Sequence, residues 1–145
     1  MSVMVADGPA ETHDVHDVLE FLSPPPGLRD LRRFTLTALD ELGLLFALRA
    51  VDEPETRLFL VPPRIYFPDY EPHLDPSVRA DLEVADGADT VLLVVVHPGQ
   101  DGRPPTANLL APVVVDPASG RAVQVVLDGD EWPLRAPLSA EGSAA

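Results

Sequence analysis

Cysteine and lysine are both absent from this chain of 145 residues, and all ten of its basic residues are arginine. Without cysteine the chain has no disulfides, no thiol nucleophile and no thiolate ligands for a metal. Its nine glycines include no dinucleotide-binding or phosphate-binding spacing, and its serines include no G-x-S-x-G nucleophile motif. These absences predict a protein that is not an enzyme and that carries no cofactor.

Long hydrophobic runs are also missing. The longest unbroken run of strongly apolar residues is 91–96, far too short to cross a bilayer. The first residues show neither the positive charge nor the apolar stretch of a signal peptide. We therefore expect a cytoplasmic protein.

The charge is strongly negative. The chain has 24 acidic residues and a formal net charge of -14, shared evenly between its two halves. Such a chain is repelled by nucleic-acid backbones and by anionic membrane surfaces, so neither is an expected partner. A basic protein, in contrast, would be attracted to it.

Seventeen prolines divide the chain into segments too short for long helices. Several segments alternate apolar and polar residues, which predicts an all-β fold. Residues 90–96 are apolar on both faces, as in a strand that is covered on both sides. The expected strands span residues 17–22, 31–38, 44–51, 56–61, 90–96, 108–116, 121–127 and 131–135.

One short helix is predicted near the middle of the chain. Asp75 can cap it, Pro76 suits its first position, Val78 and Leu82 lie on one face, and Asp86-Gly87 ends it. The composition further predicts a flexible acidic arm over residues 1–15, a single domain over residues 16–138 and a disordered tail over residues 139–145.

Two clusters offer alternative chemistry. His13, Asp14, His16 and Asp17 have side chains that could bind a transition metal and serve a metal-dependent enzyme, or they could belong to a solvated terminus. The cluster Arg29-Asp30-Leu31-Arg32-Arg33 could hold a carboxylate or phosphate, or it could form an exposed strand edge.

The stretch of residues 69–89 contains seven acidic residues and only one arginine, Arg79. It follows a proline-bounded loop that contains Tyr66, Phe67 and Tyr70. Aromatic side chains beside acidic ones are typical of a docking surface for a basic protein. Alternatively, the rings fill the core and the acids keep the protein soluble.

The order of several motifs resembles that of the bacterial flagellar assembly factor FliW family. The resemblance covers about residues 16–138. Its most specific motifs are Phe67-Pro68-Asp69-Tyr70-Glu71-Pro72 and Thr106-Ala107-Asn108-Leu109-Leu110-Ala111-Pro112; weaker ones include Leu58-Phe59-Leu60-Val61 and Pro133-Leu134-Arg135.

The resemblance implies a mainly β, small single-domain, barrel-like antiparallel fold with one or two short helices. It also implies a chaperone-like protein that binds flagellin in the cytoplasm and antagonises the translational repressor CsrA, which relieves repression of flagellin mRNA. A monomer is expected when the protein is free. An acidic mimic of nucleic acid is an alternative way to inhibit such a repressor.

The candidate residues for partner binding are Phe67, Tyr70, Glu71 and Asn108. An asparagine in a strand-like run is costly unless its amide group is hydrogen-bonded. Asn108 is therefore expected either to brace a loop or to reach a partner.

Overall fold

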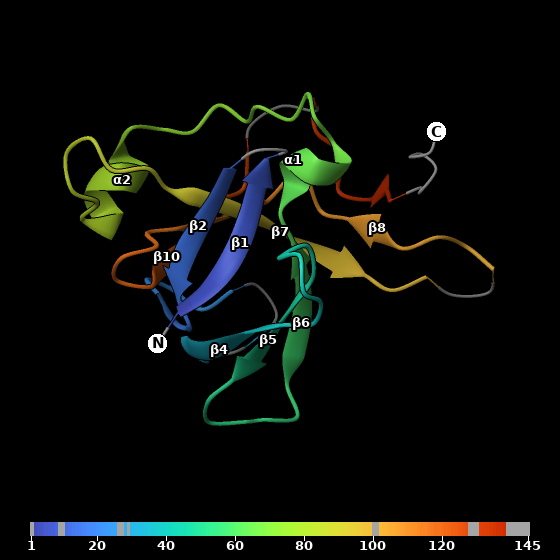
Figure 1. Cartoon of the computed structure of the whole chain (residues 1–145), viewed down its shortest axis with the longest axis horizontal. Coiled ribbons are helices and arrows are strands. Elements are labelled where there is room, and N and C mark those ends of the chain that lie inside the picture. Colours follow the sequence, from blue (N-terminus) through green and yellow to red (C-terminus); the bar gives the residue numbers. More distant parts are fainter. Residues whose placement is uncertain are drawn as a thin grey trace.

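The computed structural model describes residues 2–8, 11–25, 28, 30–99, 102–127 and 131–138 (Figure 1). Strands dominate these residues, and the helices are short. The elements are β1 (Ser2–Gly8), β2 (Glu11–His16), β3 (Val18–Phe21), β4 (Arg33–Ala38), β5 (Phe46–Ala50), β6 (Arg57–Val61), α1 (Pro63–Tyr66), α2 (Ser77–Leu82), β7 (Val91–His97), β8 (Thr106–Ala107), β9 (Val113–Val115), β10 (Arg121–Gln124) and β11 (Ala136–Pro137). Neither helix has the length or the apolar character that a bilayer-spanning segment within these residues would require.

Seven strands close into a barrel, which confirms the expected fold class. Neighbouring strands follow the order β7-β6-β5-β4-β3-β10-β9, and β9 returns to pair with β7. All of these pairs are antiparallel except β3 with β10, which run parallel. The expectation of an antiparallel barrel therefore fails at one pair only, where β10 comes from a hairpin far along the chain and lies beside β3.

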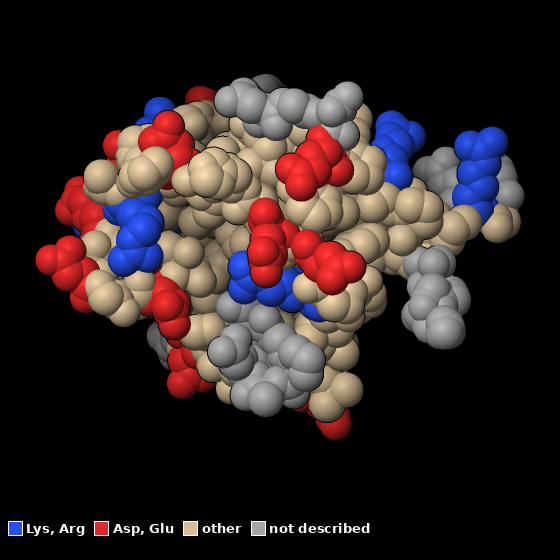
Figure 2. Space-filling model, turned by 90° about the horizontal axis from the view of Figure 1, so that it is seen from above, with Lys and Arg blue, Asp and Glu red and all other residues tan. Residues whose placement is uncertain are grey.

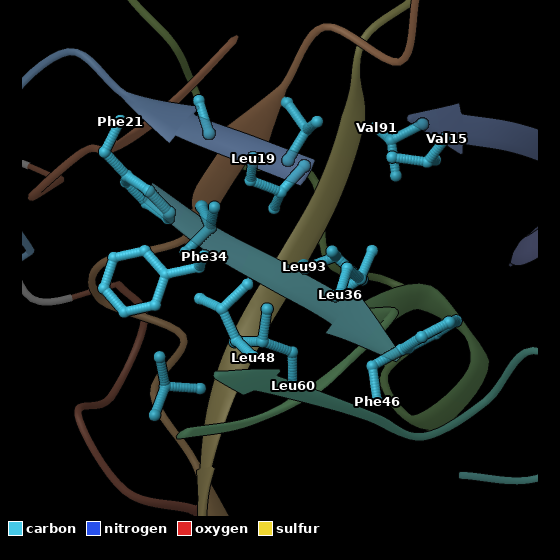
Figure 3. Packing of buried hydrophobic residues seen from close by; sticks show 14 of the residues in the cluster. Val15, Leu19, Phe21, Phe34, Leu36, Phe46, Leu48, Leu60, Val91 and Leu93 are labelled. Atoms are coloured by element: carbon cyan, nitrogen blue, oxygen red, sulfur yellow. The ribbon is translucent and has the colours of Figure 1, made fainter. Parts of the chain in front are cut away.

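The barrel interior is filled by alternate side chains of its strands. On β7, Val91, Leu93 and Val95 belong to the buried cluster inside the barrel, which we call the interior cluster. Leu92, Val94 and Val96 belong to a second buried cluster outside the barrel, which we call the outer cluster. Strand β7 is therefore covered on both faces, as its sequence predicts. Figure 3 shows the interior side chains pointing toward one another; among them are Leu19, Phe21, Phe34, Leu36, Phe46, Leu48, Leu60 and Leu93.

The first strands are part of the domain, so the prediction of a flexible arm over residues 1–15 does not agree with the structure. Strands β1 and β2 form an antiparallel hairpin, and its Val5 and Val15 are fully buried in the interior cluster. Two backbone hydrogen bonds attach the hairpin to the body, from Ala6 N to Gly43 O and from His16 N to Pro117 O. Burial of two valines and pairing of the backbone favour order here. The predicted tail, residues 139–145, lies outside the described residues.

Other differences concern element boundaries. The predicted helix ends earlier than Asp86-Gly87, because Glu83 adopts a left-handed conformation with φ of 56°. The expected last strand over residues 131–135 is wrong, since pairing begins at Ala136. Residues 108–112 are also not in a strand. There the side-chain oxygen of Asn108, and not a strand partner, accepts the hydrogen bonds of Leu110 N and Ala111 N.

Candidate functional site

The segment between β6 and β7 crosses the outside of the barrel and carries the acidic stretch (Figure 1). Pro62 and Pro63 end β6 and begin α1, where a proline is favoured in the first turn. The chain then turns twice, through hydrogen bonds from Phe67 N to Pro63 O and from Tyr70 N to Phe67 O. These turns place residues 67–76 over the outer cluster.

Helix α2 presents one apolar face to the body and leaves the rest to solvent. Its Val78 and Leu82 are buried. At its start, Asp75 Oδ1 accepts a 2.9 Å hydrogen bond from Ser77 N, and this bond lowers the pKa of the Asp75 carboxyl group. Because Val78 and Leu82 face the body, the charged residues of the helix, Arg79 and Asp81, face solvent.

All seven acidic side chains of this segment are exposed. They are Asp69, Glu71, Asp75, Asp81, Glu83, Asp86 and Asp89, and we call this surface the acidic face. In Figure 2, acidic side chains gather at the α2 end of the molecule and again near the middle of the view. Arg79 donates to Ala85 O at 3.3 Å, and Arg121 lies 3.8 Å from Glu83 in an exposed ion pair of little energetic value. The acidic face therefore keeps a strong negative field.

The four residues predicted for partner binding differ in accessibility. Glu71 is exposed and Phe67 is half-buried against the outer cluster. Tyr70 is fully buried: its hydroxyl donates to Leu109 O at 2.7 Å, and its ring meets Trp132 edge to face at 4.7 Å between centroids. The Asn108 carboxamide oxygen accepts hydrogen bonds from Leu110 N and Ala111 N, both at 3.1 Å. Tyr70 and Asn108 therefore support the loops, while Glu71 and Phe67 reach the surface.

Tyr66 is an exposed ring that precedes the acidic face in the sequence and was not among the candidate residues. It is 40% exposed, and its hydroxyl donates to Leu44 O at 3.5 Å. Burial of the rest of the ring and the nearby Asp40 carboxylate raise the pKa of Tyr66. The sequence signal was present, since Tyr66 belongs to the same aromatic loop as Phe67 and Tyr70.

The histidine and aspartate cluster is divided by the strand that contains it. In β2, His13 and His16 are an odd number of residues apart, so their side chains lie on opposite faces. His16 Nδ1 lies 3.2 Å from Val18 N, within hydrogen-bonding distance. Among the residues that the structure describes, no three His, Asp or Glu side chains are grouped to hold a metal. The geometry thus gives no support to a metal centre at these positions.

The arginine cluster is only partly visible in the structure. Arg32 and Arg33 are exposed, at the start of β4, and Arg29 lies outside the described residues. Strand β4 pairs with β3 on one side and with β5 on the other, so the alternative of an exposed strand edge is not what the structure shows.

Comparison with known proteins gives a consistent result. The family model described as FliW protein matches residues 8–138. A flagellar assembly factor FliW of Syntrophotalea carbinolica is 35% identical over 139 residues, which cover 96% of this chain and 98% of that protein. The Bacillus subtilis (strain 168) protein of the same name is 29% identical over 124 residues, covering 86% and 87%. A crystal structure of the flagellar assembly factor FliW superposes with a TM-score of 0.75 at 25% identity, covering 95% of this chain and 96% of that one.

Proposed function

Because the chain belongs to the FliW family, we propose that it binds flagellin in the cytoplasm and antagonises the repressor CsrA, which relieves repression of flagellin mRNA. In this proposal the protein is a monomer when free, and it acts through binding alone. The acidic face is the surface that meets CsrA.

The exposure of all seven acidic side chains is the observation that supports this proposal. A repressor that binds mRNA needs a positive surface, because it must contact phosphates. A negatively charged antagonist is then steered toward it, with an association rate that falls as salt rises. Glu71 and the half-buried Phe67 lie in the same segment and supply a charged and an apolar contact.

The test is a calorimetric titration of the full chain with purified CsrA and, separately, with flagellin. In the acidic-face variant, three exposed carboxylates are neutralised by Asp81→Asn, Asp86→Asn and Asp89→Asn. The control variant removes the same charge elsewhere through Glu41→Gln, Asp52→Asn and Glu55→Gln, which are also exposed. We expect CsrA affinity to fall about tenfold in the acidic-face variant and by less than about twofold in the control.

Two results would count against the proposal. If the chain binds neither protein at micromolar concentrations, the proposed function is wrong. If both variants lose the same affinity for CsrA, the acidic face is not the contact surface, because the total charge of the chain would then explain the attraction.

The same exposed carboxylates favour a second mechanism, in which the acidic face imitates RNA phosphates and occupies the RNA site of the repressor. Competition between RNA and this protein for CsrA supports that mechanism. Simultaneous binding of all three supports an antagonist that acts from a separate surface of CsrA.

A further inference from the structure

In Figure 1, β7 and β8 extend beyond the barrel at the end of the molecule opposite α2. A cleft lies there against β7, β8 and β11, the last of which pairs with β8. In the strand register, His97 lies beside Thr106, and Thr106 lies beside Pro137. Residues paired across neighbouring strands point to the same side of a sheet. These three side chains therefore form a row along one side of the cleft.

Two arginines make the described lining of the cleft positively charged, whereas the chain as a whole is strongly negative. Arg103 and Arg135 both line it, both are exposed, and no carboxylate side chain is among the described residues of its lining. In the view of Figure 2, two patches coloured as Lys or Arg lie at the end of the molecule away from α2. Two guanidinium groups that line one cleft repel each other where the described lining supplies no carboxylate, and a bound anion would relieve that repulsion.

These arginines also lack the internal bonds that other arginines of the chain form. Arg49, Arg79 and Arg121 each bond to an oxygen atom of a neighbouring residue. Within the described ranges, no hydrogen bond or ion pair involves the side chain of Arg103 or Arg135. Their donors are thus available to a ligand.

The backbone of the cleft is closely packed at one point. A Cβ atom added to Gly99 would overlap the carbonyl oxygen of Arg103 and lie 3.0 Å from Pro104 C. Only glycine lets the two arms of the β7–β8 hairpin approach this closely. The position of Arg103 therefore depends on Gly99.

We infer that this cleft binds an acidic segment of a protein partner, with a carboxylate held between Arg103 and Arg135. Planar guanidinium groups bind carboxylates through paired hydrogen bonds. The cleft has a volume of about 540 Å³, within the range of ligand sites and much larger than a free phosphate or acetate ion. Pro98, Pro104 and Pro137 form apolar walls that suit the carbon chain of a peptide. The site is distinct from the acidic face and requires a partner of the opposite charge.

The probe is a blocked tetraglutamate peptide, titrated into the isotope-labelled full chain and followed by NMR, with blocked tetraglutamine and inorganic phosphate as parallel arms. We expect tetraglutamate to shift the amide resonances of His97, Gly99, Arg103 and Thr106 saturably, and tetraglutamine to leave them in place. The variant Arg103→Gln/Arg135→Gln should bind tetraglutamate at least about tenfold more weakly. The control Arg32→Gln/Arg33→Gln removes the same charge at exposed positions and should bind within about twofold of the unmodified chain.

Three results would overturn the inference. The first is equal weakening in the two double variants, which would show attraction to net charge alone. The second is saturable binding of tetraglutamine at these resonances. The third is phosphate binding as tightly as tetraglutamate, which would make the site a simple anion site. None of these results depends on CsrA or flagellin, so failure here leaves the proposed function unaffected.

Discussion

The hydroxyl group of Tyr70 donates a 2.7 Å hydrogen bond to the backbone carbonyl of Leu109, 39 residues further along the chain. The bond joins the two motifs that carry the family resemblance most specifically. Burial raises the pKa of Tyr70 far above its ordinary value, so the hydroxyl remains protonated and available as a donor. These motifs therefore meet in the outer cluster and fix the loops beneath the acidic face.

The first prediction tests this bond. Tyr70→Phe removes the hydroxyl and leaves the Leu109 carbonyl without that donor, which should lower the free energy of unfolding by about 1–3 kcal/mol. Tyr66→Phe is the matched control, because its hydroxyl forms only a 3.5 Å bond at the surface and its loss should cost less than about 0.5 kcal/mol. Urea denaturation followed by tryptophan fluorescence measures both. Equal stabilities of the two variants would contradict the structural role of Tyr70.

A second prediction concerns Asn108. Asn108→Ala removes the acceptor of Leu110 N and Ala111 N and should destabilise the chain by about 1–2 kcal/mol. Asn108→Asp keeps an oxygen at the same place and should recover more than half of that loss. Urea denaturation measures the stability of both variants. An aspartate variant as unstable as the alanine variant would show that the side-chain oxygen of residue 108 does not stabilise this loop.

The barrel strands could be predicted because their signal is local. Leu93 and its neighbours on β7 are apolar at every position, and Phe34 and Leu36 alternate with threonines on β4. The sequence does not predict that the Tyr70 side chain points inward. Both of its neighbours, Asp69 and Glu71, are exposed, and Leu109, which accepts its hydrogen bond, is distant in the sequence. Sequence alone therefore selected the segment of the candidate site but not which of its side chains face solvent.

The N-terminal hairpin and the arginine cleft were missed for a related reason. Each hairpin strand buries little more than one valine, Val5 or Val15, among polar residues that suggest a solvated arm. Arg103 and Arg135 come together only because β8 pairs with β11. Attachment of the hairpin to the body and formation of the cleft both depend on contacts between distant segments, which residue types and spacing do not specify.

The third prediction tests whether the hairpin contributes to the core. Val5→Ala should lower the free energy of unfolding by about 1.5–3 kcal/mol, because the Val5 side chain is fully buried. Met4→Ala alters the adjacent residue, which is 43% exposed, and should change stability by less than about 0.5 kcal/mol. Thermal and urea unfolding measure both variants. A flexible arm would give no difference between them.

The fourth prediction is a pH dependence at α2. The hydrogen bond from Ser77 N lowers the folded-state pKa of Asp75 below its unfolded value of about 3.9. Its stabilising contribution is therefore complete above that value and is lost as pH falls through the folded-state pKa. We expect protection of the α2 amides from hydrogen exchange to fall in this acidic range. Asp75→Asn should remove that component, and an unchanged pH profile in this variant would assign the effect to other carboxylates.

The fifth prediction separates backbone conformation from close packing at two glycines. Gly120 and Gly87 both have positive φ, 84° and 79°, which costs a non-glycine residue about 1–2 kcal/mol. A Cβ atom at Gly120 would overlap the carbonyl oxygen of Val18, whereas nothing lies within 4 Å of one at Gly87. Gly120→Ala should therefore destabilise the chain by at least about 2 kcal/mol more than Gly87→Ala, because β3 must move away from the β9–β10 turn. Urea denaturation measures both variants. Equal losses of stability would show that the turn can move without disturbing the parallel pairing of β3 with β10. The closure of the barrel would then not depend on this contact.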